Sequence, residues 1–177
     1  NGTSYGLSEI LNETGFDESS YLASHGDLLE AFGNNASSAL NHYINYGQSE
    51  GRAPDSFDEW SYLASHGDLL EAFGSNTSSA TQHYVNNGHS EGRSTDSFDE
   101  WSYLASHGDL LEAFGSNTSS ATQHYVNYGH SEGRSTDSFD AAAYIEKYDD
   151  LLAAFGSNTV AATQHYVSNG YSEGRRI

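Results

Sequence analysis

Histidine and carboxylate side chains recur at fixed spacing in this 177-residue chain and are its first candidates for chemistry. Imidazole and carboxylate groups together suit transition metals such as Zn, Cu or Ni. One hypothesis is therefore a divalent-metal site that draws on the nine histidines, which form three series: His25, His66 and His107; His42, His83, His124 and His165; His89 and His130.

The spacing of these histidines favours a second interpretation. No two of them stand at the i, i+4 spacing of a helical metal clamp, and the last repeat retains only His165. A helical His followed by Tyr is typical of a hydrogen-bonded partner in an interface. Calcium is the other candidate ion, with Asp55, Asp58 and Glu59 as ligands, but the EF-hand pattern is absent and a solvated helix N-terminus is the favoured interpretation of these acids.

An Asp, a Glu and an Arg also keep the same positions in every repeat. Four of the six cations of the chain belong to this set. Since a guanidinium matches a carboxylate in shape and charge, we expect each Arg to bind either the helix-capping Asp or an acid of the adjacent repeat. We interpret the set as staples between neighbouring repeats: Asp27, Glu50 and Arg52; Asp68, Glu91 and Arg93; Asp109, Glu132 and Arg134; Asp150, Glu173 and Arg175.

These residues sit on a tandem repeat with a period of 41 residues. The second and third copies differ only at Asn87 and Tyr128. We assign four repeats, at 16–56, 57–97, 98–138 and 139–177, preceded by a partial repeat over 1–15. A small all-α solenoid is the predicted fold, because units of this length bury their apolar faces by stacking on neighbours.

Three short helices are predicted in each repeat. In the second, Ser56 is the expected N-cap of a helix in which Phe57, Trp60 and Leu63 share a face. His66-Gly67 breaks that helix, and Asp68 is expected to cap the next, which ends at Gly74. A third helix is expected over 78–87 with Gly88 as its stop, and no alternating strand pattern occurs.

Composition restricts the possible partners. The net charge of −19 argues against nucleic acid, because phosphate neutralisation needs clustered Lys and Arg. There is no cysteine, no long apolar run that predicts a membrane span, and no signature of a nucleophile elbow, P-loop or zinc protease, so we expect no enzyme activity. Because the sequence starts without Met or a signal segment, we interpret it as a mature, processed chain.

Asparagines in turn segments fit the N-x-Ser/Thr acceptor pattern for glycosylation. Polar turns rich in Asn, Ser and Thr also generate this pattern by chance, so both interpretations stay open. The candidates are Asn1, Asn12, Asn35, Asn76 and Asn117.

The two ends of the chain depart from the repeat consensus. Ile10 and Leu11 form an apolar patch in the partial repeat, which we expect to cap the first repeat or pack on another subunit. In the last repeat, Ala141 to Ala143 remove side-chain bulk, a change that favours close packing over solvation. Terminal repeats normally carry a polar outer face instead.

The strings YLASHGDLLEAFG and HYVNxGxSEGR resemble tandem helical repeats of secreted and cell-surface bacterial proteins. That resemblance covers nearly the whole chain and implies an extracellular or surface location with a structural or adhesive role. It carries over no catalytic residue.

The leading functional hypothesis is an extracellular structural protein that self-associates head to tail as a homo-oligomer or filament. A metal-binding module, with Cu, Zn or Ca as the ion, is the second. The third is adhesion to glycans or a host surface through Tyr46, Asn87 and Tyr128.

Overall fold

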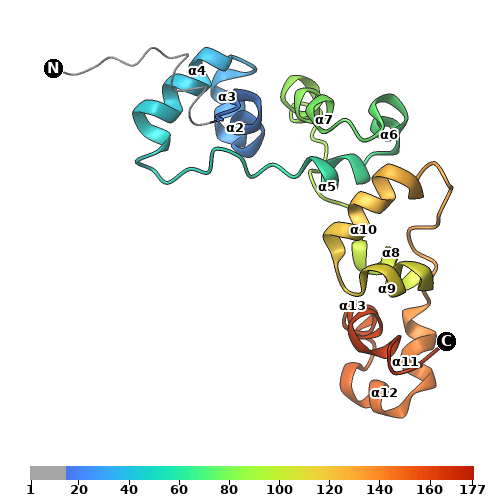
Figure 1. The fold of residues 1–177 in the computed structure, drawn as a ribbon. Helices are drawn as coiled ribbons and strands as arrows, with labels where there is room; N and C mark the ends of the chain where they lie inside the picture. The colour runs from blue at the N-terminus through green and yellow to red at the C-terminus, as the bar shows by residue number, and fades with distance from the viewer. Residues whose placement is uncertain (1–14) are drawn as a thin grey trace. The chain divides into compact units, whose positions relative to one another are not determined.

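A computed structural model describes residues 15–177 of the chain (Figure 1). Over these residues it contains twelve α-helices and four π-helical segments, with no strand. The helices recur in four units of about 41 residues, so the prediction of an all-α tandem repeat is confirmed. The predicted partial repeat and its Ile10–Leu11 patch lie outside the described residues, apart from Gly15.

Each repeat contains three α-helices of six or seven residues followed by a π-helical segment. The first helices are α2 (Glu18–Ser24), α5 (Glu59–Ala64), α8 (Glu100–Ser106) and α11 (Ala141–Lys147). The second helices are α3 (Gly26–Phe32), α6 (Gly67–Phe73), α9 (Gly108–Phe114) and α12 (Asp149–Phe155). The third helices are α4 (Ala36–His42), α7 (Thr77–His83), α10 (Thr118–His124) and α13 (Thr159–His165). The π-helical segments are η1 (Tyr43–Gly47), η2 (Tyr84–Gly88), η3 (Tyr125–Gly129) and η4 (Tyr166–Gly170).

The N-caps of the first two helices differ from those predicted. Asp58 caps α5, its carboxylate accepting a hydrogen bond from the Ser61 amide, so the prediction of Ser56 was wrong. Phe57 is buried and precedes the helix, which moves the cap one residue past it. Helix α6 has no side-chain cap, and Asp68 lies in its first turn, where its carboxylate binds an arginine.

The core of each repeat is organised around a tyrosine of its first helix. Tyr62 is fully buried, lies edge-on to the ring of Tyr84 and is tilted against Phe57. Phe57 in turn stacks on Tyr84, with ring centroids 4.8 Å apart. Three aromatic side chains from three segments therefore hold the first helix, the preceding connector and the π-helical segment together. The equivalent tyrosines, Tyr21, Tyr103 and Tyr144, are also fully buried.

Gly88 was predicted to end the third helix, but it lies inside η2. The predicted single helix over 78–87 is divided into α7 and this π-helical segment, whose closing bond runs from the His89 amide to the Tyr84 carbonyl. A Cβ atom at Gly88 would collide with the Tyr62 hydroxyl. Glycine is therefore required here for close packing. Gly74, in contrast, ends α6 with φ of 58°, as the sequence predicted.

The described chain separates into two compact units, which end and begin at Asp96 and Ser97. Each unit contains two of the predicted repeats, and the same contact joins them in both units. In unit 1, α2 packs on α7 and η2, and in unit 2, α8 packs on α13 and η4. The first helix of one repeat therefore packs on the third helix and π-helical segment of the next.

We predict that Gly88→Ala destabilises the protein by about 1–3 kcal/mol, because the added methyl group displaces the buried Tyr62 side chain. Thermal and denaturant unfolding followed by circular dichroism measure this loss. Asn87→Ala, at the exposed neighbouring position, is the control. Equal stability of the two variants would contradict the packing role of Gly88.

Candidate interaction surfaces

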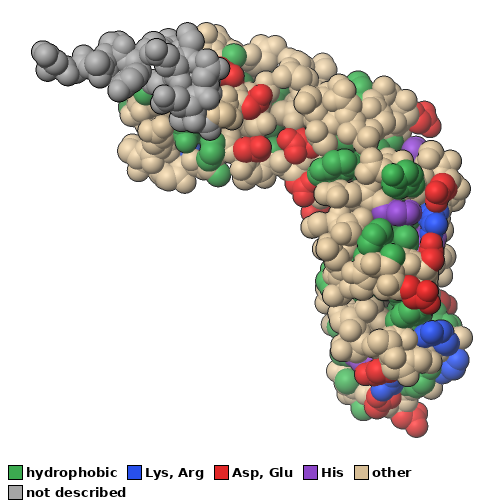
Figure 2. All heavy atoms as spheres, in the orientation of Figure 1, with side chains coloured by type: hydrophobic (Ala, Val, Ile, Leu, Met, Phe, Trp, Pro, Cys, Tyr) green, Lys and Arg blue, Asp and Glu red, His purple; other side chains and the backbone are tan. Residues whose placement is uncertain are grey.

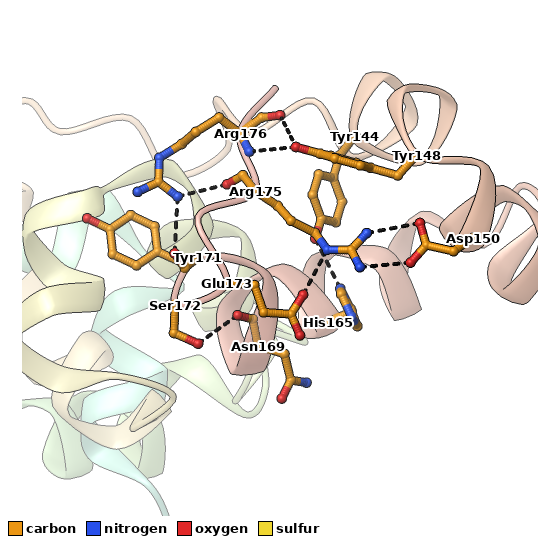
Figure 3. Close-up of polar contacts among 10 residues, drawn as sticks. All are labelled: Tyr144, Tyr148, Asp150, His165, Asn169, Tyr171, Ser172, Glu173, Arg175 and Arg176. Carbon is orange, nitrogen blue, oxygen red and sulfur yellow. Dashed lines mark hydrogen bonds and ion pairs between the residues drawn. The ribbon is translucent and has the colours of Figure 1, made fainter.

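The repeated Arg binds two carboxylates of its own repeat. Figure 3 shows Arg175 between Asp150 and Glu173, with the guanidinium forming a two-pronged contact to Asp150 at 3.0 and 2.8 Å. The Nε atom donates to Glu173 at 2.7 Å. The same ion pairs recur in the other three repeats between Arg52, Arg93 or Arg134 and the corresponding Asp and Glu.

Each Arg therefore binds the Asp that was predicted as its partner at the start of the second helix, but the ion pairs lie inside single repeats, so their interpretation as staples between neighbouring repeats was wrong. Each Arg follows the π-helical segment and reaches back to the second helix, so it closes the repeat onto itself. The hydrogen bond from Arg52 holds the pKa of Asp27 below its ordinary value, and Arg175 does the same for Asp150. The carboxylates are largely exposed, so water screens much of this attraction.

The histidine of each third helix is a partner of the buried tyrosine. The hydroxyl of Tyr62 lies 3.0 Å from Nδ1 of His83, and Figure 3 shows the equivalent pair Tyr144 and His165. Burial raises the pKa of Tyr62 to about 12. A neutral phenol at the centre of the core, held by an imidazole, satisfies a buried hydroxyl and is not an activated nucleophile. The same contact joins Tyr21 to His42 and Tyr103 to His124.

The other histidines also have structural partners. In the break between the first two helices, His25, His66 and His107 contact the carbonyl oxygens of Ala53, Ser94 and Ser135 through Nε2. In the connector, Nδ1 of His89 and of His130 lies 3.4 Å from the hydroxyl of Tyr84 and of Tyr125.

Across residues 15–177, no group of three or more His, Cys, Asp or Glu side chains is arranged to hold a metal ion. Of the acids considered for calcium, Asp58 caps α5, and Glu59 accepts a hydrogen bond from the Thr81 hydroxyl. Metal binding stays a prediction that calorimetric titration with Cu, Zn and Ca can test.

The asparagines of the sequons cap the third helices. Asn35, Asn76 and Asn117 each accept a hydrogen bond through Oδ1 from the amide three residues later. Asn158 makes the same cap although Val160 removes the acceptor pattern there. The need for a cap therefore explains the asparagine in each repeat without glycosylation, while the side chains stay exposed enough to be modified. Asn1 and Asn12 lie outside the described residues.

The residues considered for glycan adhesion occupy equivalent positions in their π-helical segments. Tyr46 and Tyr128 are 60% and 59% exposed, and Asn87 is also exposed. Each tyrosine ring lies 5.7 Å from the ring of the preceding helical histidine, His42 or His124. Adhesion through these side chains stays a prediction.

The alanines of the last repeat open a groove within unit 2. Ala141 and Ala142 line a hollow of about 580 Å³ together with Trp101 and Val160. In unit 1 the corresponding hollow has a volume of about 90 Å³, and Glu59 takes the place of Ala141. Loss of side-chain bulk therefore leaves space between the two repeats of unit 2, where we had expected closer packing.

The last repeat also exposes several large apolar side chains and has a low net charge. Leu152, Val160 and Ile177 are 49%, 67% and 51% exposed. Repeat 4 has a net charge of −2, from five acids and three bases, whereas each of the other three repeats has −5, from six acids and one base. Figure 2 shows Lys and Arg side chains gathered in the region that Figure 1 labels α11 and α12. The three bases are Lys147, Arg175 and Arg176.

Leu152 differs sharply from its equivalents. Leu29 and Leu111, at the same position of α3 and α9, are 5% and 6% exposed. Leu70, the equivalent residue of repeat 2, is also only 6% exposed although no repeat follows repeat 2 within unit 1, so the exposure of Leu152 is particular to repeat 4. We had not singled out Leu152, because the sequence has the same Asp-Leu-Leu in all four repeats. The signal that was available is the change of the next residue from Glu to Ala153.

Repeat 1 shows the complementary difference on its third helix and π-helical segment. Tyr43 and Ile44 are half-buried, whereas the equivalent Tyr84 and Val85 of repeat 2 are 8% and 9% exposed. In repeat 2 these positions belong to the segment on which α2 packs. Tyr125 of repeat 3, the first repeat of unit 2, is likewise half-buried, but the adjacent Val126 is 6% exposed, so Ile44 is the position that distinguishes repeat 1.

No helix in residues 15–177 has both the length and the apolar composition required to cross a bilayer. In comparisons with family models, curated proteins and solved structures, nothing matches this chain. The resemblance to bacterial surface repeats therefore stays a prediction.

We predict that stability falls as the pH is lowered from 7.5 to 5.5. Burial lowers the pKa of His124 below its ordinary value of 6.5, so the unfolded chain binds this proton more readily than the folded chain. The stability that neutral His124 contributes is therefore complete above pH 6.5 and is lost as the pH falls below it. Thermal unfolding at several pH values measures the trend.

His124→Gln is expected to flatten this pH dependence. The comparison stops at pH 5.5 because burial raises the pKa of Glu59 above its ordinary value of 4.5, which acts in the opposite direction at lower pH. The aspartates bound to arginine lose their contribution only in more acidic solution. An unchanged slope in the variant would rule out His124 as the group responsible.

Proposed function

We propose that this chain is an extracellular structural protein that self-associates head to tail through the exposed faces of its terminal repeats. The observation that carries the proposal is the exposure of Leu152, because the equivalent leucine is buried in each of the other three repeats, as Leu29, Leu70 and Leu111. Full burial of an exposed leucine side chain is worth about 1.5–3 kcal/mol, and since Leu152 is 49% exposed, a partner that covers it gains roughly half of that free energy.

The reduced charge of repeat 4 supports the same conclusion. With a total charge of −19, two copies of this chain repel each other at long range. A repeat of net charge −2 is the part of the chain that approaches a second acidic copy at the lowest electrostatic cost. Salt screens the remaining repulsion, so association should strengthen as ionic strength rises.

A contact between two different faces adds copies in one direction. Such a head-to-tail interface is heterologous, and it produces a filament whenever the rotation between successive copies does not close a ring. The repeated polar groups suit this structural role, because the Arg, Asp and Glu series and the Tyr–His pairs are engaged in holding each repeat together.

The extracellular location rests on composition and on the resemblance. The chain is strongly acidic, and its repeat strings resemble those of secreted and cell-surface bacterial proteins. An assembly of acidic repeats would stay soluble and hydrated at a cell surface.

Leu152→Glu is predicted to weaken self-association roughly 10- to 100-fold, because it replaces the apolar contact by a charge on an acidic surface. Light scattering and electron microscopy over a concentration series measure the assembly. Ala113→Glu adds the same charge at an exposed position of α9 and should leave association nearly unchanged. If the unmodified chain stays monomeric up to its solubility limit at high salt, the proposed function is wrong.

A further inference from the structure

The contact between repeats inside each unit specifies how a second copy would dock. Within unit 1, the Gln82 amide donates to the Ser19 hydroxyl and the Asn34 amide donates to Asn86. The first bond joins repeat 1 to the third helix of repeat 2, across 63 positions of sequence. The second joins repeat 1 to the π-helical segment of repeat 2, across 52 positions. In unit 2 the Tyr171 hydroxyl donates to Glu112 across the corresponding contact.

One position of this interface is occupied by a glycine under an aromatic ring. A Cβ atom on Gly26 would lie 3.2 Å from the His89 ring, and a Cβ atom on Gly108 would lie 3.2 Å from the Tyr171 side chain. The ring of the following repeat thus rests on the start of the second helix. A larger residue at the glycine position would have to push this ring away.

Both members of this pair are changed in the terminal repeats. The glycine position of repeat 4 is Asp149, and the ring position of repeat 1 is Gln48. An aspartate has no room under an aromatic ring, but its carboxylate can accept a hydrogen bond from the glutamine amide. Asp149 and Gln48 are both exposed in the chain. The two departures from the repeat are chemically matched to each other.

We propose that repeat 1 of a second copy docks through α4 and η1 on α11 and α12 of repeat 4, in the register of the internal contacts, with Gln48 facing Asp149. This inference rests on the proposed self-association and gives it a defined geometry. In the same register, Asn45 of one copy faces Ser157 of the other, in place of the Asn86 and Asn34 pair of unit 1. A hydroxyl and an amide preserve the hydrogen-bonding capacity of that position.

The apolar part of the contact follows from the same register. The half-buried Tyr43 and Ile44 of η1 correspond to the buried Tyr84 and Val85, which belong to the segment that receives α2 in unit 1. Docking covers them with the first helix of repeat 4, which carries Ala142 where α2 carries Ser19.

Cysteine cross-linking tests this register directly, because the chain has no cysteine of its own. One preparation carries Asp149→Cys and another carries Gln48→Cys, and the two are mixed under mild oxidation. A disulfide requires Cα atoms within about 7 Å, so only the proposed register brings the two thiols together. We expect covalent dimers in the mixture and a ladder of covalent oligomers when one chain carries both substitutions.

The control mixture combines Asp149→Cys with Ser90→Cys, at an exposed position of repeat 2. Circular dichroism verifies that each variant is folded like the unmodified chain. Cross-linking no faster than in this control, in a chain that still associates by light scattering, overturns the register and leaves the proposed function standing. Efficient dimers of Asp149→Cys alone would instead indicate a tail-to-tail contact and overturn it as well. A chain that does not associate at all overturns the proposed function and this inference together.

Discussion

The structure depends on the close approach of a buried tyrosine to a glycine of the π-helical segment. In repeat 2 the Tyr62 hydroxyl lies where a side chain at Gly88 would have to be, while the His83 imidazole satisfies the hydroxyl at 3.0 Å. The ring meanwhile packs on Phe57 and Tyr84. One side chain therefore joins the first helix, the third helix, the π-helical segment and the connector.

This arrangement explains how helices of six or seven residues are stable in the protein. Isolated helices of that length are not stable in water, because nucleation costs more than so few hydrogen bonds return. The aromatic cluster supplies tertiary contacts to each helix, and the Asp58 cap and the Arg93 ion pairs hold their ends. A repeat is thus closed internally by polar bonds, and its apolar faces remain to be covered by neighbours.

The polar bonds that stabilise a single repeat and the apolar faces that pack on another repeat are formed by different residues. The Arg–Asp–Glu sets act inside a repeat, so they are retained even in the last one, where Arg175 binds Asp150 and Glu173. The residues that change at the ends are those of the stacking faces, such as Asp149 and Gln48. This distribution of constant and altered positions supports the proposed contact between copies.

The sequence by itself determined the 41-residue period and the helical class, because an internal repeat and the absence of an alternating strand pattern are visible in the sequence alone. It also determined the glycine exit at Gly74. It did not determine the helix caps, since several polar residues near Ser56 are capable of capping and the burial of Phe57 decides among them.

Only the tertiary structure decided which contacts the repeated polar residues make and which surfaces stay open. Asp68, Glu91 and Arg93 carry the same charges whether they pair inside a repeat or between repeats, and the chain path brings them together inside one. Leu152 is identical in type to Leu70 and Leu111, yet it is 49% exposed where each of them is 6% exposed, and only the packing in the folded chain distinguishes them. Burial depends on residues far away in the sequence, so local pattern does not reveal it.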